Sequence, residues 1–116
     1  MSLAVNMYIK DDILFVRFKG ELDENHVSDL RLRLVKYIEL HNIKHLVFNF
    51  ERLSFLDSSG IGLIIGRYQQ LKAIGGDVTI CNMNDKIERI IRISGLMKIC
   101  KIRDNEESVL MFVGAR

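Results

Sequence analysis

The hydrophobic residues of this chain switch repeatedly between a two-residue and a helical spacing, and this switching limits its fold more than any other feature. The segments with strand-like alternation or short apolar runs are residues 3–9, 13–18, 43–50, 77–83 and 97–103. A helical pattern follows each of them except the first, which gives the order β-β-α-β-α-β-α-β-α. Because strands separated by helices are usually parallel neighbours, we expect an α/β fold with a mixed β-sheet.

Capping and stop signals set the expected helix boundaries. The predicted starts are Asp23, Asp57 ahead of a helix over 58–74, Asn84, and a capping box from Asp104 to Glu107. Glycines supply the predicted stops at Gly75-Gly76 and Gly95, since a left-handed turn after a helix suits glycine. The four helices are therefore bounded by residues of suitable chemistry.

Length and composition indicate one soluble domain over residues 1–116. With 48% apolar residues, no proline and a net charge of +2, the sequence supports one core and offers no basic stripe for nucleic acid. No apolar run approaches the roughly 20 residues that cross a bilayer, and no export signal is visible, so we expect a cytoplasmic protein. Cys81 and Cys100 lie in apolar runs and are expected to be buried thiols, without a metal site.

A polar cluster between the third strand and the second helix is the candidate functional segment. Asp57 can cap this helix, which leaves Ser58 at the first helical position with Ser59 beside it. Backbone N–H groups at a helix start are unsatisfied and partly positive, so a phosphate on an exposed serine there is tolerated.

The glycines of the same helix need an explanation. Each interior glycine costs about 1 kcal/mol relative to alanine, so Gly60, Gly62 and Gly66 together cost about 2 to 3 kcal/mol. The helical projection places the core face on Ile61, Ile64, Tyr68 and Leu71, and the opposite side on Gly62, Gly66, Gln69 and Ala73. Close approach by a second molecule would offset the loss. Periodicity supports equally well a second interpretation, in which the serines only cap and the glycines fit a neighbouring loop.

The sequence does not match the common motifs of catalytic sites. A dinucleotide-binding turn would need a third glycine at position 65, which is Ile65, and a serine hydrolase elbow would need glycine two residues before Ser58 or Ser59. The histidines show no ligand or base spacing, and Arg67 is interpreted as a solvated helix residue. We therefore expect no enzyme activity and no catalytic residue.

Several blocks together resemble a known family. They are Gly20-Glu21-Leu22-Asp23, Leu53 to Gly62 with Asp57-Ser58-Ser59-Gly60, Gly66-Arg67-Tyr68 running to Gly75-Gly76, and Ile93 to Ile99. In this order and spacing they resemble the anti-sigma factor antagonists of the STAS domain family, most closely the sporulation antagonists that oppose the anti-sigma-F factor. The resemblance spans the whole chain and implies a mixed sheet with helices packed mainly on one face.

The resemblance also implies a mechanism. In that family the unphosphorylated antagonist binds an anti-sigma factor that is also a serine kinase, and the sigma factor is released. The kinase then phosphorylates the serine that follows the aspartate, and a serine phosphatase restores the active form. Carried over to this sequence, the phosphoacceptor is Ser58, with Ser59 as second choice, and Asp57 and Gly60 support the site.

The resemblance assigns docking residues as well. Glu21 and Asp23 match the loop that meets a basic residue of the kinase, and Ile61, Gly62 and Gly66 match the docking helix. Their sequence pattern alone favours a cap for Asp23 and a surface charge for Glu21. No cofactor is expected on this chain, because ATP or ADP belongs to the partner kinase, and a monomer suffices. A nucleotide-binding or a transporter-associated STAS regulatory module remains the alternative.

Overall fold

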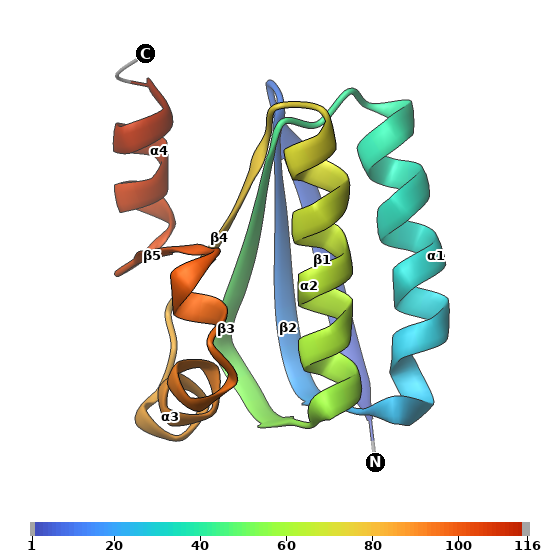
Figure 1. The fold of residues 1–116 in the computed structure, drawn as a ribbon, viewed down its shortest axis with the longest axis vertical. Helices are drawn as coiled ribbons and strands as arrows, with labels where there is room; N and C mark the ends of the chain where they lie inside the picture. The colour runs from blue at the N-terminus through green and yellow to red at the C-terminus, as the bar shows by residue number, and fades with distance from the viewer. Residues whose placement is uncertain (1, 115–116) are drawn as a thin grey trace.

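The computed structural model describes residues 2–114 (Figure 1). Its elements are β1 Leu3–Lys10, β2 Ile13–Leu22, α1 Glu24–Leu40, β3 His45–Leu56, α2 Ser58–Ala73, β4 Asp77–Cys81, α3 Asp85–Ser94, the 3-10 helix η1 Leu96–Lys98, β5 Lys101–Arg103 and α4 Glu106–Gly114. Apart from the short η1, this is the predicted order of strands and helices.

The strands of the described part form one sheet in the order β1-β2-β3-β4-β5. β1 and β2 are antiparallel, whereas β2 through β5 are parallel to one another. Asp11 makes the hairpin turn between β1 and β2 with a φ of 56°, a conformation that aspartate tolerates better than most residues. The predicted mixed sheet with a parallel portion is therefore confirmed.

The helices cover the two faces of the sheet unequally. Alternate residues of β2 point to opposite sides, so Leu14 and Val16 join the main core, whereas Ile13 and Phe15 join a small second cluster. α1, α2 and α3 pack over the main core, and Val109 of α4 completes the second cluster (Figure 1). The expectation of helices mainly on one face is confirmed.

Two central strands are longer than the sequence pattern indicates. The apolar run predicts an end of β3 at residue 50, but its continuation 51–56 pairs with the end of β2, from Lys19↔Arg52 to Leu22↔Leu56. β4 pairs with β3 only as far as Asn49, so this extension has one neighbouring strand. Several of its side chains are therefore exposed and polar, and they interrupt the apolar pattern that would predict a strand. The supposed connecting loop is reduced to the single residue Asp57.

Two predictions for the C-terminal third differ from the structure. The predicted strand over 97–103 is wrong in its first part, since the chain there forms η1 and only Lys101–Arg103 pairs with β4. Asn105, not Asp104, caps α4, because the Ser108 N–H donates to the Asn105 Oδ1 at 2.8 Å. By contrast, Asn84 caps α3 and Gly95 ends it at a φ of 83°, as predicted.

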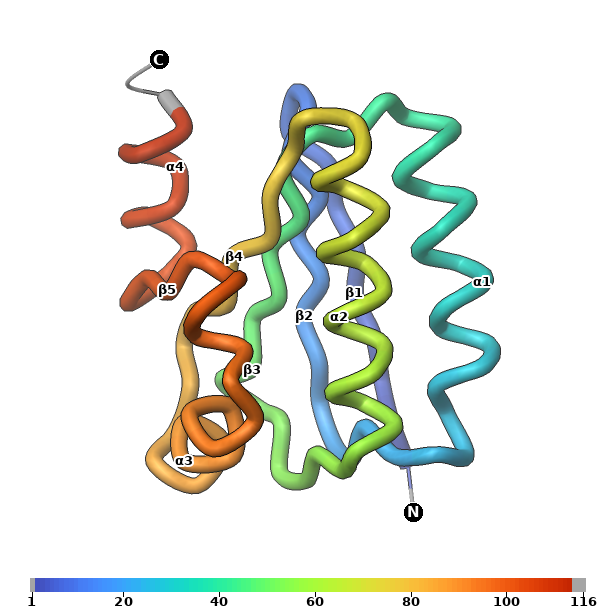
Figure 2. The backbone as a smooth tube through the Cα atoms, in the orientation of Figure 1, coloured from blue at the N-terminus to red at the C-terminus, as the bar shows by residue number. Residues whose placement is uncertain are grey.

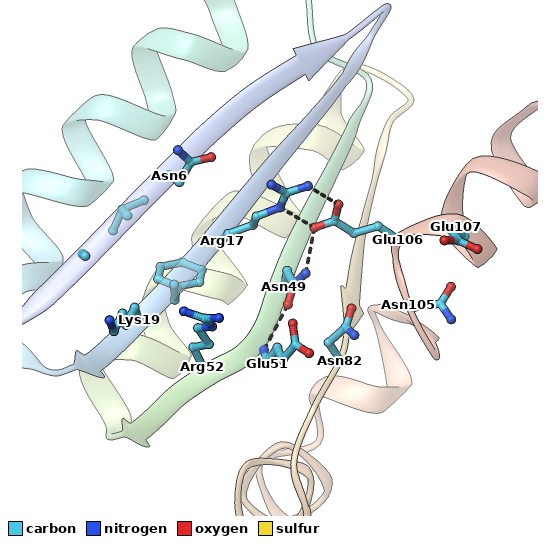
Figure 3. A pocket seen from close by; sticks show the side chains of 13 residues that line it. Asn6, Arg17, Lys19, Asn49, Glu51, Arg52, Asn82, Asn105, Glu106 and Glu107 are labelled. Atoms are coloured by element: carbon cyan, nitrogen blue, oxygen red, sulfur yellow. Dashed lines mark hydrogen bonds and ion pairs between the residues drawn. The ribbon is translucent and has the colours of Figure 1, made fainter.

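Glu106 fastens α4 to the open face of the sheet (Figure 3). The Arg17 Nε and Nη2 donate to its two carboxylate oxygens at 2.9 and 2.7 Å. The Tyr8 hydroxyl and the Asn49 Nδ2 donate to the same carboxylate at 2.9 and 2.7 Å. These hydrogen bonds, led by the one from Arg17, lower the pKa of Glu106 to about 2 from its ordinary value of 4.5.

Replacing Glu106 with glutamine should lower the free energy of unfolding by about 1 to 2 kcal/mol at pH 7, because charge-assisted hydrogen bonds are lost. The folded-state pKa is depressed, so the contribution is complete above pH 4.5 and disappears as the pH falls toward 2. Urea unfolding at pH 7 and pH 3 should therefore show a smaller difference from wild type at pH 3. Glu107→Gln, at an exposed neighbour, is the control. A difference that does not change with pH would mean that the carboxylate charge is not its source.

Candidate functional site

Two segments that are distant in the sequence meet at one end of the molecule. The last pairs of β2 and β3 are Glu21↔Phe55 and Leu22↔Leu56. The Asp57 N–H then donates to the Leu22 carbonyl at 3.4 Å. As a result α1 and α2 begin side by side at the same end of the fold (Figure 2).

Asp57 organises this end. Its Oδ1 accepts from the N–H groups of Ser59 and Gly60 at 2.9 and 3.1 Å, which makes it the N-cap of α2 as predicted. Its Oδ2 accepts from the N–H of Glu24, the first residue of α1, at 3.2 Å. One carboxylate therefore ties the starts of both helices together and fixes the position of Ser58.

The two adjacent serines differ in access. Ser58 is exposed at the first position of α2, and its hydroxyl makes no hydrogen bond to another described residue. Ser59 is half-buried. An enzyme approaching from solvent reaches Ser58 more directly, so access favours Ser58 as the acceptor.

Gly60 has a reason to be glycine that lies inside the fold. A Cβ at this buried position would lie 2.4 Å from the Leu56 Cδ1 and 3.1 Å from the Leu22 carbonyl oxygen. The helix start can approach the ends of β2 and β3 only without a side chain here. For Gly60, the interpretation that a glycine fits a neighbouring segment of the same chain is correct.

Gly62 and Gly66 have no such reason. A Cβ at either position would meet nothing within 4 Å. Together with Ser58 they form an outward stripe on α2, called here the glycine ridge. For these two glycines the interpretation that they fit a neighbouring loop is wrong within residues 2–114. The helix carries their unfavourable helix propensity without a compensating contact of its own.

The buried face of α2 is rotated from the predicted one. Its buried side chains are Leu63, Ile64, Arg67 and Leu71, whereas Ile61 and Tyr68 are half-buried and pack against the edge of the core. Ile61 therefore lies beside the glycine ridge and presents only part of its side chain outward. The interpretation of Arg67 as a solvated residue is wrong, because only 7% of it is exposed.

The two acidic docking candidates have different environments. Asp23 is 4% exposed, and its Oδ1 accepts from the Asn25 N–H at 3.0 Å and lies 2.8 Å from the His26 Nδ1, which confirms the predicted cap. Glu21 is half-buried, and its Oε2 is covered without a hydrogen-bond partner among the described residues. Asp23 thus fixes the loop by capping α1, whereas the Glu21 carboxylate has one oxygen, Oε2, without a hydrogen bond to the described part of the chain.

Phe55 also lies at this end of the molecule, and the sequence analysis did not single it out. It lies opposite Glu21 in the sheet, and 38% of it is exposed. The strict alternation fails here, since Ser54 and Phe55 are both exposed, so periodicity could not single it out. An exposed aromatic ring beside an acidic group and the start of α2 is a typical element of a protein interface.

The other reactive side chains have structural environments. His45 Nδ1 and Lys101 Nζ each lie 2.8 Å from the Asp77 carboxylate, which links β3, β4 and β5. Burial raises the pKa of the Cys81 and Cys100 thiols to about 12, so both stay protonated. In the described part of the chain no cluster of three His, Cys, Asp or Glu side chains could hold a metal. None of its helices is both long and apolar enough to span a bilayer.

Comparison with known proteins gives consistent matches over nearly the whole chain. The STAS domain family matches residues 4–109. The anti-sigma F factor antagonist of Paenibacillus polymyxa is 39% identical over 111 residues, which covers 95% of this chain and 94% of that protein. The corresponding protein of Lysinibacillus sphaericus is 31% identical over 83% of this chain and 81% of its own length.

Solved structures agree with these matches. The anti-sigma factor antagonist SpoIIAA in its unphosphorylated form superimposes with a TM-score of 0.84 at 30% identity, covering 96% of this chain and 97% of that one. The Bacillus cell fate determinant SpoIIAA in its phosphorylated form gives a TM-score of 0.76 at 31% identity, covering 95% and 99%.

Proposed function

Because this chain belongs to the STAS domain family, we propose that it is an anti-sigma factor antagonist, which binds an anti-sigma factor and so allows a sigma factor to act. The observation that carries the proposal is the exposed Ser58 hydroxyl at the head of a glycine ridge that no described side chain covers. Relatives at 39% and 31% identity carry the name of anti-sigma F factor antagonist. Sporulation is the process in which we expect the protein to act.

Phosphorylation of Ser58 would end the binding. A phosphoserine adds about −1.5 to −2 charge, and the partly positive start of α2 can accept this charge without disturbing the fold. The same group adds bulk and charge at the place where a partner would approach the glycine ridge, beside the Asp57 carboxylate. The switch would therefore change docking and leave folding intact. A solved relative in a phosphorylated form supports this part of the proposal.

The proposed docking surface consists of the glycine ridge, Ile61, Glu21 and Phe55. The half-buried carboxylate of Glu21 has an acidic charge that suits a basic side chain of the partner, and the exposed part of Phe55 suits an apolar contact. The partner would be an anti-sigma factor with serine kinase activity that holds ATP or ADP, and a serine phosphatase would reverse the modification. The protein would act as a monomer in the cytoplasm and carry no cofactor or catalytic group of its own.

Displacement of the sigma factor tests the proposed function. A complex of the anti-sigma-F-type factor and sigma factor of the same bacterium is formed with nucleotide, and this chain is added. We expect stoichiometric release of the sigma factor, which size exclusion chromatography or fluorescence anisotropy measures. A sigma factor that stays bound at tenfold excess of this chain would contradict the proposal. Nucleotide bound by this chain alone would favour the alternative of a nucleotide-binding module.

A further inference from the structure

Arg67 is a buried cation without a counter-charge. Only 7% of the residue is exposed, and its Nε and Nη1 are covered and make no hydrogen bond among the described residues. Burial lowers the pKa of Arg67, and a second positive charge, Arg31 of α1, lowers it further. In the described part no acidic side chain has an electrostatic effect that offsets these two. The guanidinium therefore lies in an environment that disfavours its charge.

This guanidinium lies where α1 and α2 pack together. The Gln70 Nε2, three residues further along α2, donates to the Val35 carbonyl of α1 at 3.3 Å. Arg31 is one helical turn before Val35 and is exposed. The α1–α2 seam, defined by Arg31 and Val35 on α1 and by Arg67 and Gln70 on α2, thus carries two arginines.

A buried charge without a partner is unfavourable, and a group of opposite charge would offset this cost. Removing a charged side chain from water is strongly unfavourable unless hydrogen bonds and an opposite charge replace the water. A planar guanidinium matches a carboxylate in shape and charge. Because Nε and Nη1 of Arg67 are covered, Nη2 is the nitrogen that a carboxylate from outside would reach first. The chain itself offers no such carboxylate in residues 2–114, so the compensating anion would come from outside.

The seam adjoins the proposed docking surface. Gly66 of the glycine ridge lies one helical turn before Gln70, whose side chain donates to the Val35 carbonyl of α1. Gly66 also directly precedes Arg67 in the sequence, so the glycine ridge borders the seam. A docked protein that covers Gly62 and Gly66 would also reach the seam.

We propose that the α1–α2 seam is a second contact of the docking surface, where Arg67, helped by Arg31, receives a carboxylate side chain of the bound anti-sigma factor. This inference rests on the proposed function and adds to it an acidic residue on the partner. It also gives the buried arginine a role, since its charge is kept unpaired in the free protein and is paired in the complex.

Arg67→Met tests the inference because it separates binding from stability. Methionine keeps the apolar volume and removes the unpaired charge, so the melting temperature should rise by about 4 °C or more. The affinity for the anti-sigma factor, measured by calorimetry, should fall by about tenfold or more. The affinity of the variant should also depend less on salt than that of the wild type. Arg33→Met is the matched control, since Arg33 is exposed on α1 and lies two positions from Arg31.

The possible outcomes are distinct. Binding by Arg67→Met within twofold of the wild type would overturn the inference while leaving the proposed function standing. Lower melting temperature together with weaker binding would also overturn it, because Arg67 would then be a structural residue. A wild-type protein that does not bind the anti-sigma factor would refute the proposed function itself. If sodium acetate or sodium sulfate stabilises the wild type but not Arg67→Met, and the partner affinities are equal, the site holds a free anion instead.

Discussion

A Ser58→Asp variant should bind the anti-sigma factor at least about a hundredfold more weakly than the wild type, which corresponds to about 3 kcal/mol. Ser58 is exposed at the first position of α2, so a carboxylate there faces the incoming partner and lies next to the Asp57 side chain. An acidic residue in the first turn of a helix is also favourable for the helix itself. The melting temperature of the variant should consequently equal or exceed that of the wild type, and calorimetry with the anti-sigma factor measures the affinity.

Two controls make this result specific. Ser58→Ala removes the hydroxyl without adding charge and should bind within a few-fold of the wild type. Ser59→Asp places the same charge one residue away at a half-buried position and should weaken binding much less than Ser58→Asp, provided that it folds. Wild-type affinity in Ser58→Asp would show that charge at the head of α2 does not control docking.

Replacing Gly62 with leucine should weaken binding of the anti-sigma factor by about one to two orders of magnitude while stabilising the isolated protein. Nothing lies within 4 Å of a Cβ at this position, so the fold can accept the larger side chain. Leucine in place of an interior helical glycine should raise the free energy of unfolding by about 1 kcal/mol. In the complex the same side chain would separate two surfaces that pack closely, and such overpacking typically costs about 1 to 3 kcal/mol. Urea unfolding and calorimetry measure the two effects.

The matched control for this variant is Ala73→Leu, which adds apolar volume to the exposed last residue of the same helix. It should leave the affinity within a few-fold of the wild type. Gly62→Ala should fall between the wild type and Gly62→Leu in affinity. If Gly62→Leu binds as tightly as the wild type, the glycine ridge is not part of the interface, and another reason for its glycines must be found.

The sequence predicts the structure correctly at positions where residues close together in the chain determine it. Asp23, Asp57 and Asn84 cap helices because each short polar side chain accepts from backbone N–H groups two or three residues further on. Gly95 ends α3 because its φ of 83° suits glycine. The order of strands and helices follows from spacing in the same way, since buried faces repeat with the period of each element.

Features that depend on distant neighbours escaped the sequence analysis. The extension of β3 to Leu56 exists because β2 continues beside it, and the strand pattern of residues 51–56 is masked by exposed side chains. The burial of Arg67 depends on how α1 packs against α2, which no pattern within α2 reveals. An arginine at the border of the apolar face was the available signal, because a long side chain there can extend along a neighbouring helix.

At the candidate site, pattern and geometry contributed different parts. The pattern singled out Ser58, Ser59 and the glycines, and the resemblance added Glu21; the pattern alone could not separate Ser58 from Ser59. The structure adds the exposure of Ser58, the half-burial of Ser59 and the internal reason for Gly60. Side-chain access is set by the angle at which the helix meets the sheet, so it could not be obtained from the sequence alone.

Mapping of the modified residue tests the central claim most directly. The protein is incubated with the anti-sigma factor kinase of the same bacterium and ATP, and intact mass spectrometry is followed by peptide mapping. We expect one phosphoryl group, located on Ser58, and none on the Ser58→Ala variant under the same conditions. Phosphorylation of Ser58→Ala to the wild-type level, or a single phosphoryl group located on another residue of the wild type, would contradict the assignment of Ser58 as the switch.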